Sequence, residues 1–365
     1  MSAGPFATRG QAGPVSGQAS PFSHADYRVG WISALPLEFT AALAMLDKRH
    51  LPLPRLVHDN NVYMLGEIRS HNVALVCLPA GQMGNNAAAT VASQMRVTFP
   101  AISFWLMVGI GGGAPSPEHD IRLGDVVVSR PGKNDAGVIQ YDFGRTIEAG
   151  RFVRSGTLNA PPAILLNAVS ALQGVHSIYG HQLHEHLKVF EELGALKAKY
   201  TYRGWENDIV YEASYDHSSD LSDCSQCDEM KMVRRDCRDQ PTLPVIHYGS
   251  IASGNQVMRH GETRERLRKE MDVLCFEMEA AGLMNNFPCL VIRGICDYAD
   301  SHKNKDWQDY AAATAAAYAK ELLSFVPGSK VVTSPVPTQP VKASPAPSQS
   351  YGESISCLAV VAVCN

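Results

Sequence analysis

The sequence predicts an α/β fold, and three observations support this prediction. Short apolar runs of strand length occur at residues 29–34 and 102–108. Residues 38–46 and 85–96 instead place apolar or alanine residues at helical spacing. Glycines or acidic residues directly follow several apolar runs, which is where ligands bind in open α/β sheets. We therefore expect strands and helices to surround one core.

The other expected elements follow in chain order. Residues 35–37 form a turn that opens the first helix, because a proline fits the first helical turn. Two runs, 62–68 and 73–79, are joined by a short polar segment and predict a β-hairpin. Further strands are expected at 123–129 and 245–254, and further helices at 163–172, 181–193 and 307–325.

Length and composition fit one large domain with a sizeable core. The chain has 365 residues, of which 45% are apolar and 19% charged. Its formal net charge of -4 offers no basic field for nucleic acid, so a small soluble ligand is the simpler partner. Nine cysteines in such a chain predict reduced thiols and a cytoplasmic protein. No segment reaches the ~20 apolar residues that span a bilayer, so no membrane contact is expected.

Composition also divides the chain into parts. Residues 1–26 are rich in Gly, Ala, Pro and Ser and are expected to be disordered. Residues 27–327 form the expected domain, with a polar insertion at about 205–244. Residues 328–365 are a Pro- and Ser-rich tail, whose apolar end at 356–365 is too short to span a membrane.

Three acidic residues stand where chemistry could take place. Asp297 follows an apolar run at the end of an expected buried strand, and Glu277 and Glu279 lie two residues apart just upstream. In an extended chain these two glutamates would point to the same side. From spacing alone, the simpler interpretation is that Asp297 caps the next helix and that the two glutamates are solvated.

Four motifs resemble the nucleoside phosphorylase and nucleosidase superfamily, whose members cleave the N-glycosidic bond of nucleosides. The motifs are Met278-Glu279, Arg293-x-x-Cys296-Asp297, the segment 29–38 that ends in Glu38, and the glycine-rich segment 108–114 with the strand 123–129. They cover roughly residues 27–326 in family order, and the first segment resembles in particular the methylthioadenosine/S-adenosylhomocysteine nucleosidases. Fungal and bacterial defence proteins carry similar phosphorylase domains. The resemblance implies a single-domain fold with a central, mostly parallel mixed sheet flanked by helices.

The resemblance also implies roles for individual residues. Asp297, kept protonated by apolar surroundings, would protonate the purine, and Glu38 would activate the attacking water. Glu279 would accept hydrogen bonds from the ribose hydroxyls. Arg293 is expected to pair with Glu277, because an arginine next to Asp297 would ionise it. The other expected substrate-binding residues are Met278, then Gly109, Ile110 and Gly111 in a glycine-rich turn, and Val257 and Met258 in the base-binding segment. In the family an aromatic residue usually stacks on the purine, where this chain has Val257.

The glycine-rich segment departs from the phosphorylases in a way that predicts hydrolysis. Those enzymes usually hold phosphate with an arginine and a serine, where this chain has Met107 and Ile110. Neither residue supplies a charge-assisted donor, so water is the expected nucleophile and purine nucleoside hydrolysis the expected reaction. Phosphorolysis, cleavage of a nucleotide such as ATP, and a non-catalytic signalling or defence role are the alternatives. Glu38 could also be an ordinary first-turn acid stabilised by the helix dipole.

No cofactor and no metal site are expected, although one cysteine pair leaves a question open. The histidines within 181–193 do not share one helix face. Cys224-x-x-Cys227, with Cys237 later and His217 nearby, could be half of a zinc site. No second pair follows at finger spacing, so unliganded thiols are favoured. As in the family, we expect a homo-oligomer (dimer, trimer or hexamer) that binds a nucleoside or nucleotide.

Overall fold

The computed structural model describes residues 20–218, 220 and 223–328 of the chain. Most of the expected disordered segment and nearly all of the expected tail, with its apolar end, lie outside the described residues. Residues 20–26, which were also expected to be disordered, contain the 3-10 turn His24–Asp26. The ring of Phe22 stacks on that of His50 at a centroid distance of 4.3 Å. Ordered structure therefore begins before Tyr27.

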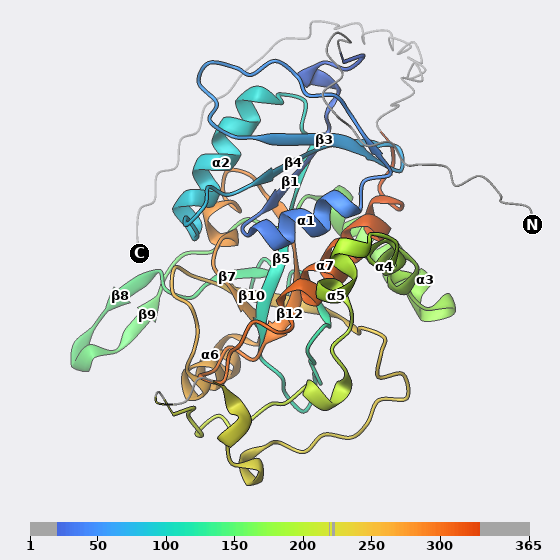
Figure 1. Cartoon of the computed structure of the whole chain (residues 1–365). Helices are drawn as coiled ribbons and strands as arrows, with labels where there is room; N and C mark the ends of the chain where they lie inside the picture. The colour runs from blue at the N-terminus through green and yellow to red at the C-terminus, as the bar shows by residue number, and fades with distance from the viewer. Residues whose placement is uncertain (1–19, 219, 221–222, 329–365) are drawn as a thin grey trace, which may run out of the picture. The chain divides into compact units, whose positions relative to one another are not determined.

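A ten-stranded mixed sheet forms the centre of the molecule (Figure 1). Its strands are β1 Val29–Ser33, β2 Lys48–Arg49, β3 Tyr63–Ile68, β4 His71–Cys77, β5 Phe104–Gly113, β6 Val126–Ser129, β7 Val138–Gln140, β10 Ile246–Ser253, β11 Val273–Glu277 and β12 Cys289–Asp297. Their order is β11-β10-β6-β12-β5-β1-β4-β3-β2, with β7 beside β10, and β11 also pairs with the end of β5. Pairs among β4, β1, β5 and β12 are parallel, as are those of β10 with its neighbours. The fold class expected from the sequence is confirmed.

Alternating side chains along the strands fill two cores, one on each face of the sheet. In β1, Trp31 belongs to one core and its neighbour Ile32 to the other. In β5, Leu106 and Met107 are divided in the same way, and all four side chains are fully buried. Burial on both faces explains why these strands are nearly continuous apolar runs in the sequence.

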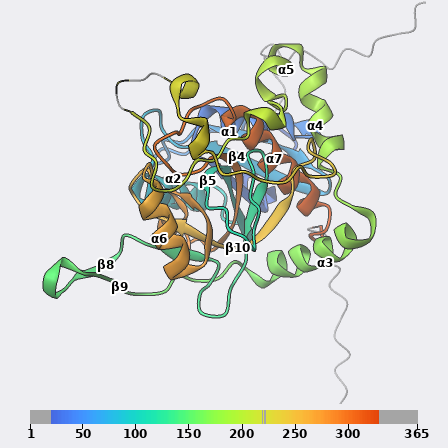
Figure 2. The same cartoon turned by 90° about the horizontal axis from the view of Figure 1, so that it is seen from below.

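Helices cover both faces of this sheet. They are α1 Pro36–Ala44, α2 Asn85–Thr98, α3 Ala163–Tyr179, α4 Leu183–Glu192, α5 Gly194–Tyr200, α6 Gly261–Met271 and α7 Gln308–Leu323. Helices α1 and α7 pack together in one core with α3 and α4, whereas α2 contributes to the other core. Figure 2 shows α4 and α5 side by side near α7. None of the helices among the described residues combines the length and the apolar character that a membrane crossing requires.

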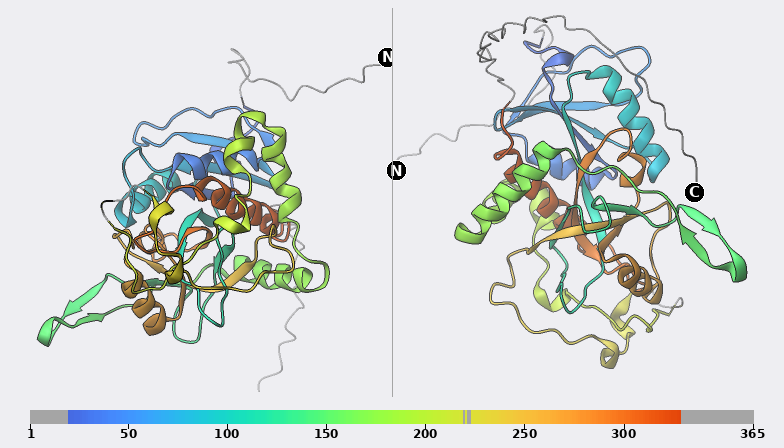
Figure 3. Two further views of the ribbon diagram at one scale, coloured as in Figure 1. Left: turned by 60° about the horizontal axis from the view of Figure 1, so that its bottom comes forward. Right: turned by 180° about the vertical axis from the view of Figure 1, so that it is seen from behind.

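Two segments extend from this core. Strands β8 (Gly144–Thr146) and β9 (Phe152–Arg154) form a hairpin that projects from the body of the molecule (Figures 1 and 3). The polar insertion expected at about 205–244 runs between α5 and β10 as irregular chain with short 3-10 turns. Arg238 anchors it to the core, because its Nη2 lies 2.7 Å from Oδ2 of the buried Asp125.

The glycine-rich segment is a strand and not the turn expected from the sequence. β5 continues through it, pairing with β12 along Gly109 and with β11 at Gly112. A Cβ atom on Gly109 would overlap Oε1 of Glu38, and one on Gly112 would lie 2.8 Å from Oδ1 of Asp297. The glycines therefore allow both acids to approach the backbone of β5 closely.

Candidate active site

The acidic residues noted in the sequence meet at one edge of the sheet. Glu38 lies in the first turn of α1 directly after β1, Glu277 ends β11 and Asp297 ends β12. The strands β1 and β12 both run parallel to β5, so their carboxyl ends lie at the same edge, which is where α/β folds bind ligands, whereas β11 is antiparallel to β5 and brings Glu277 there from the opposite direction. Together they line a cavity of about 390 Å³, a size that suits a small molecule.

The cavity contains nearly all of the residues expected at the site. Its lining includes Glu38, Ile110, Gly111, Val257, Met258, Glu277, Met278, Glu279, Arg293 and Asp297. Gly109 was also expected to contact the substrate, but it does not line the cavity. It lies beneath the carboxylate of Glu38, so its contribution is the space that this side chain occupies.

Arg293 is the centre of the charged cluster. Its side chain is fully buried and pairs with Glu277, as expected. Its Nη2 also lies 3.4 Å from Oε2 of Glu279, and its Nη1 donates to the backbone oxygen of Ile110 at 3.3 Å. Both glutamates are buried, so the interpretation in which they are solvated is wrong. Removing Arg293 would leave two buried carboxylates without their counter-charge, which is strongly destabilising.

Glu38 is held by three backbone N–H groups. Its Oε2 accepts hydrogen bonds from Ala34 at 2.7 Å and Leu35 at 2.9 Å, and its Oε1 accepts one from Ile110 at 2.8 Å. The bond to Leu35 closes the start of α1, so Glu38 does serve as a first-turn acid. The same side chain also forms part of the cavity wall. The structural and the catalytic interpretations of Glu38 are therefore compatible.

Glu279 lies where the chain leaves the extended conformation. It directly precedes the 3-10 turn Ala280–Gly282, so it does not share an extended strand with Glu277. Its N–H donates to Oε2 of Glu277 at 3.0 Å, and its Oε1 accepts from the N–H of Gly84 at 3.3 Å. The turn brings both carboxylates to Arg293 from different directions.

Asp297 has polar neighbours, so the expectation of apolar surroundings alone is wrong. Nζ of Lys303 lies 3.0 Å from its Oδ2, and the thiol of Cys296 donates to the same oxygen at 3.0 Å. Oδ1 accepts the N–H of Ala299 at 2.9 Å. Burial alone would lower the pKa of Lys303, but the carboxylate of Asp297 outweighs it and raises that pKa. Asp297 is therefore one member of an ion pair.

The carboxylates compete for one arginine, and this changes their proton affinities. Burial raises the pKa of Glu38 above its ordinary value of 4.5, while Arg293 and three backbone N–H groups act in the opposite direction. Burial also raises the pKa of Glu279 to about 7, opposed by Arg293 and assisted by the negative charges of Glu277 and Glu38. Shifted carboxyl groups inside a cavity are typical of catalytic sites.

Val257 and Met258 were expected to bind the base, but they are not the only cavity residues suited to that role. Val257 lines the cavity together with Met258 but remains 48% exposed. Sequence analysis missed Phe276, which also lines the cavity and packs edge-on against Tyr141 at a centroid distance of 5.8 Å. The indication in the sequence was that Phe276 directly precedes Glu277. Phe276 gives the cavity the aromatic surface that Val257 cannot provide.

The loop between β12 and α7 supplies two further cavity residues that sequence analysis missed. Lys303 and Lys305 both line the cavity, and they are cations next to a site rich in carboxylates. Their signal was only the presence of two lysines shortly after Asp297. Nothing in the sequence indicates that this loop returns to the site.

A family model matches the part of the chain that contains most of these residues. The model described as "Phosphorylase superfamily" matches residues 200–326. This range includes Glu277, Glu279, Arg293 and Asp297, whereas Glu38 lies outside it.

Two known proteins align with most of the chain. A nucleotide-binding leucine-rich repeat (NLR)-like protein of Hyaloscypha variabilis is 46% identical over 303 residues, which are 82% of this chain and 29% of that protein. The ATP nucleosidase Cap17 of Escherichia coli is 25% identical over 302 residues, which are 80% of this chain and 50% of that protein. The chain thus spans half or less of the length of these relatives.

A solved structure agrees in fold. Futalosine hydrolase of Helicobacter pylori has a TM-score of 0.52 and 17% sequence identity, covering 83% of this chain and 99% of that chain. At this identity the likeness shows the fold alone. The family model, the aligned relatives and the fold agree with the motifs around Glu279 and Asp297. The part of the chain that the model matches, residues 200–326, therefore belongs to the phosphorylase superfamily.

Proposed function

We propose that this chain hydrolyses the N-glycosidic bond of a purine nucleoside or nucleotide and releases the free base and the sugar. The observation that carries the proposal is that Glu38, Glu279 and Asp297 line one cavity. Such a set provides a base for water, an acceptor for the sugar hydroxyls and an acid for the leaving base. The name of one relative, ATP nucleosidase, supports this class of reaction.

The proposed reaction passes through a sugar cation similar to that of glycosidases. Asp297, whose carboxylate pairs with Lys303, takes up a proton from solvent when the substrate binds and gives it to a purine ring nitrogen, while the electrons of the C–N bond move onto the base, which leaves neutral. Lys303, 3.0 Å away, stabilises the carboxylate that remains. Glu38 takes a proton from water as the water oxygen bonds to the anomeric carbon. Release of this proton from Glu38 to solvent restores the Glu38 carboxylate and balances the proton that Asp297 took up.

Glu279 holds the ribose in this proposal. Its carboxylate accepts hydrogen bonds from the sugar hydroxyls, and its negative charge favours the positive charge that develops at the anomeric carbon. The N–H of Gly84 and the guanidinium of Arg293 fix the carboxylate before substrate arrives. A fixed acceptor loses little entropy when the sugar binds.

The position of Glu38 favours water over phosphate as the nucleophile. Its Oε1 accepts the N–H of Ile110, a donor in the segment where phosphorylases hold phosphate. A phosphate dianion placed there would meet the Glu38 carboxylate, and like charges at short distance repel. Met107 is buried and apolar, so it offers the anion no compensation. Water is neutral and needs only a carboxylate to orient it.

A substrate panel with and without phosphate tests the proposed function. Base release from purine nucleosides should persist in phosphate-free buffer, and millimolar phosphate should leave the rate nearly unchanged. The sugar product should be ribose. Detection of ribose 1-phosphate as the main product would contradict hydrolysis and indicate a phosphorylase. Absence of base release from every substrate would favour a non-catalytic role.

A nucleotide is a second candidate substrate because cations lie beside the site. Lys303 and Lys305 line the cavity, and Lys303 also borders a neighbouring cavity of about 900 Å³ that contains Arg259. Phosphate groups bind such side chains through charge-assisted hydrogen bonds. The relative named ATP nucleosidase supports this candidate. In the same panel, a higher kcat/KM for ATP than for adenosine would favour the nucleotide.

Replacing Glu279 by alanine should affect ribosides more than 2'-deoxyribosides. A hydrogen bond to a charged group contributes about 1.5–3 kcal/mol, so we expect kcat/KM on adenosine to fall ~10- to 100-fold further than on 2'-deoxyadenosine. The measurement is the ratio of the two kcat/KM values in the wild type, Glu279→Ala and Glu279→Gln. Equal losses on both substrates would contradict a contact between Glu279 and the 2'-hydroxyl.

A further inference from the structure

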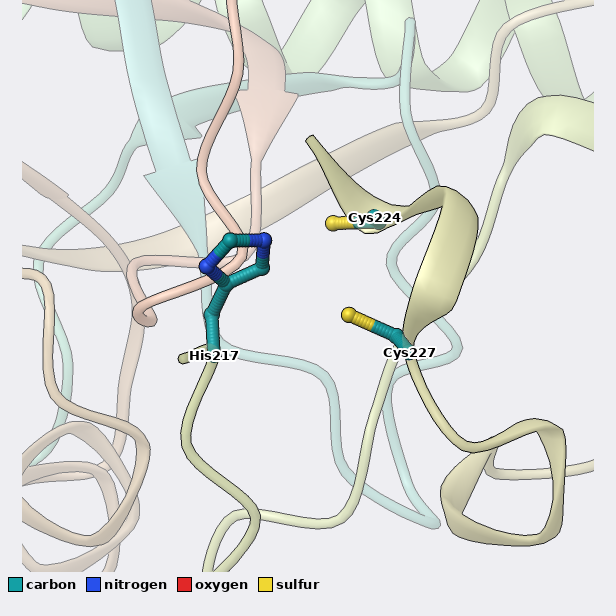
Figure 4. Close-up of side chains that lie close together, drawn as sticks. All are labelled: His217, Cys224 and Cys227. Carbon is teal, nitrogen blue, oxygen red and sulfur yellow. The ribbon is translucent and has the colours of Figure 1, made fainter. Parts of the chain in front are cut away.

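Three potential metal ligands of the insertion face one small space. His217, Cys224 and Cys227 each offer one ligand atom, and these atoms all lie within 4.8 Å of one another. Figure 4 shows the imidazole ring and the two sulfur atoms directed towards each other. The three side chains do not line the cavity that contains Glu38 and Asp297. His217 and Cys224 instead line the neighbouring cavity that contains Arg259, and no step of the proposed bond cleavage uses them.

The chemistry of these ligands selects zinc. Thiolates and imidazole bind Zn²⁺, whereas Mg²⁺ and Ca²⁺ prefer oxygen ligands. Bonds of about 2.3 Å to sulfur and 2.0 Å to nitrogen place the ligand atoms of a tetrahedral site about 3.5–3.8 Å apart. The observed cluster needs only small side-chain rotations to reach that geometry. Nε2 of His217 lies 2.9 Å from the backbone oxygen of Asp223, and coordination through this nitrogen would replace that hydrogen bond.

His302 lies next to the cluster but outside the group whose ligand atoms lie within 4.8 Å of one another, so its ring would have to move towards the ion to become a fourth ligand. It is buried, and within the described chain neither of its ring nitrogens has a hydrogen-bond partner. Buried polar atoms normally have a hydrogen-bond partner, so the two ring nitrogens of His302 are free to bind a metal ion. Its ring centroid lies 5.6 Å from that of His217, and its backbone oxygen accepts the thiol of Cys224 at 3.8 Å. We propose that His217, Cys224 and Cys227 bind a zinc ion, with His302 as the fourth ligand.

The proposed ion joins the insertion to the loop of the active site. Three ligands come from the insertion, whereas His302 lies in the loop between Asp297 and α7. The next residue, Lys303, pairs with Asp297. A metal that fixes His302 therefore also fixes the backbone that positions the Lys303 ammonium. The ion has a structural role, and no step of the proposed reaction uses it.

Metal analysis of the purified full chain tests this proposal. We expect about one zinc ion per chain after purification without chelators, as in structural sites of this ligand class. The double variant Cys224→Ser/Cys227→Ser should lose it. Cys237→Ser is the matched control, because Cys237 is an exposed thiol of the same insertion outside the cluster, and it should retain the zinc. With Co²⁺ in place of zinc, sulfur-to-metal charge-transfer absorption should appear in the wild type and the control only.

Several results would overturn the proposal. They are an absence of zinc from the wild type, equal zinc content in the wild type and the double variant, or a Cys224–Cys227 disulfide in protein prepared without reductant. If the double variant does not fold, His217→Ala keeps both thiols and should bind zinc more weakly in competition with a chromogenic chelator. His302→Ala should weaken it as well, and unchanged affinity would remove His302 from the ligand set.

Removal of the metal should also have a structural signature. Chelation should lower the Tm of the wild type and of Cys237→Ser, because metal binding contributes to folding free energy. It should leave the Tm of the double variant unchanged. Limited proteolysis should cut the insertion faster in the chelated wild type than in the untreated protein. Equal cleavage rates and an unchanged Tm would contradict a structural zinc site.

Discussion

Asp297→Asn should abolish nearly all turnover on purine substrates, with kcat falling by ~10² to 10⁴. Asparagine can still donate a hydrogen bond to the base, but it cannot transfer a proton to it. The Lys303 ammonium, 3.0 Å from Oδ2 in the wild type, would also lose its counter-charge. The measurement is base release under single-turnover conditions, with Tm as a check of folding.

The control for this variant comes from the same loop. Asp306 is exposed and does not line the cavity, so Asp306→Asn should keep the wild-type rate. A folded Asp297→Asn variant with the kcat of the wild type would show that Asp297 is not the acid.

Glu38→Gln should slow base release by ~10² or more, because glutamine cannot accept the proton of the attacking water. The substitution also replaces a carboxylate oxygen with an amide group among three N–H donors, so some loss of stability is expected. Rates should therefore be compared at a temperature where both proteins are fully folded. Glu270→Gln is the matched control, since Glu270 is exposed and its ion pair among the described residues is with Arg266 on α6.

The pH dependence of the rate distinguishes catalysis by Glu38 from a purely structural role. The base must be ionised, and burial raises the pKa of Glu38 above 4.5. The rate should therefore fall on acidification at a higher pH than an ordinary glutamate would impose. The pKa of Glu279 is raised to about 7, so protonation of Glu279 also contributes to the loss of rate at low pH. In Glu38→Gln the acid limb should change position, whereas a pH profile of unchanged shape would contradict the assignment.

Most of the residues that line the cavity could be identified from the sequence because they lie in short motifs near strand ends. Glu38 and Asp297 each follow an apolar run closely, and the carboxyl ends of parallel strands converge in an α/β fold. The pairing of Arg293 with Glu277 could be predicted for two reasons. A buried arginine needs a carboxylate partner, and an arginine next to Asp297 would ionise that residue. These inferences need only local sequence and a known fold class.

The remaining features depend on contacts between distant segments. A run of glycines after an apolar strand usually predicts a turn, and only the pairing with β11 and β12 shows that β5 continues through it. Lys303 reaches Asp297 because the loop turns back, which no local pattern specifies. His217 was noted near Cys224 and Cys227, but no second pair follows at finger spacing, so the sequence favoured unliganded thiols. In each case tertiary structure supplied the partner.

The position of β12 has a consequence for synthesis of the chain. This strand, Cys289–Asp297, is the last one within the described residues, and it is inserted between β5 and β6, which are made much earlier. At translation rates of about 5–20 residues per second, roughly 10–30 s separate the emergence of β6 from that of β12. Throughout this time β5 and β6 have unpaired edges on the sides that later join β12, and such edges are prone to aggregate. The nascent chain therefore needs protection from other chains until its final strand closes the sheet and delivers Asp297 to the site.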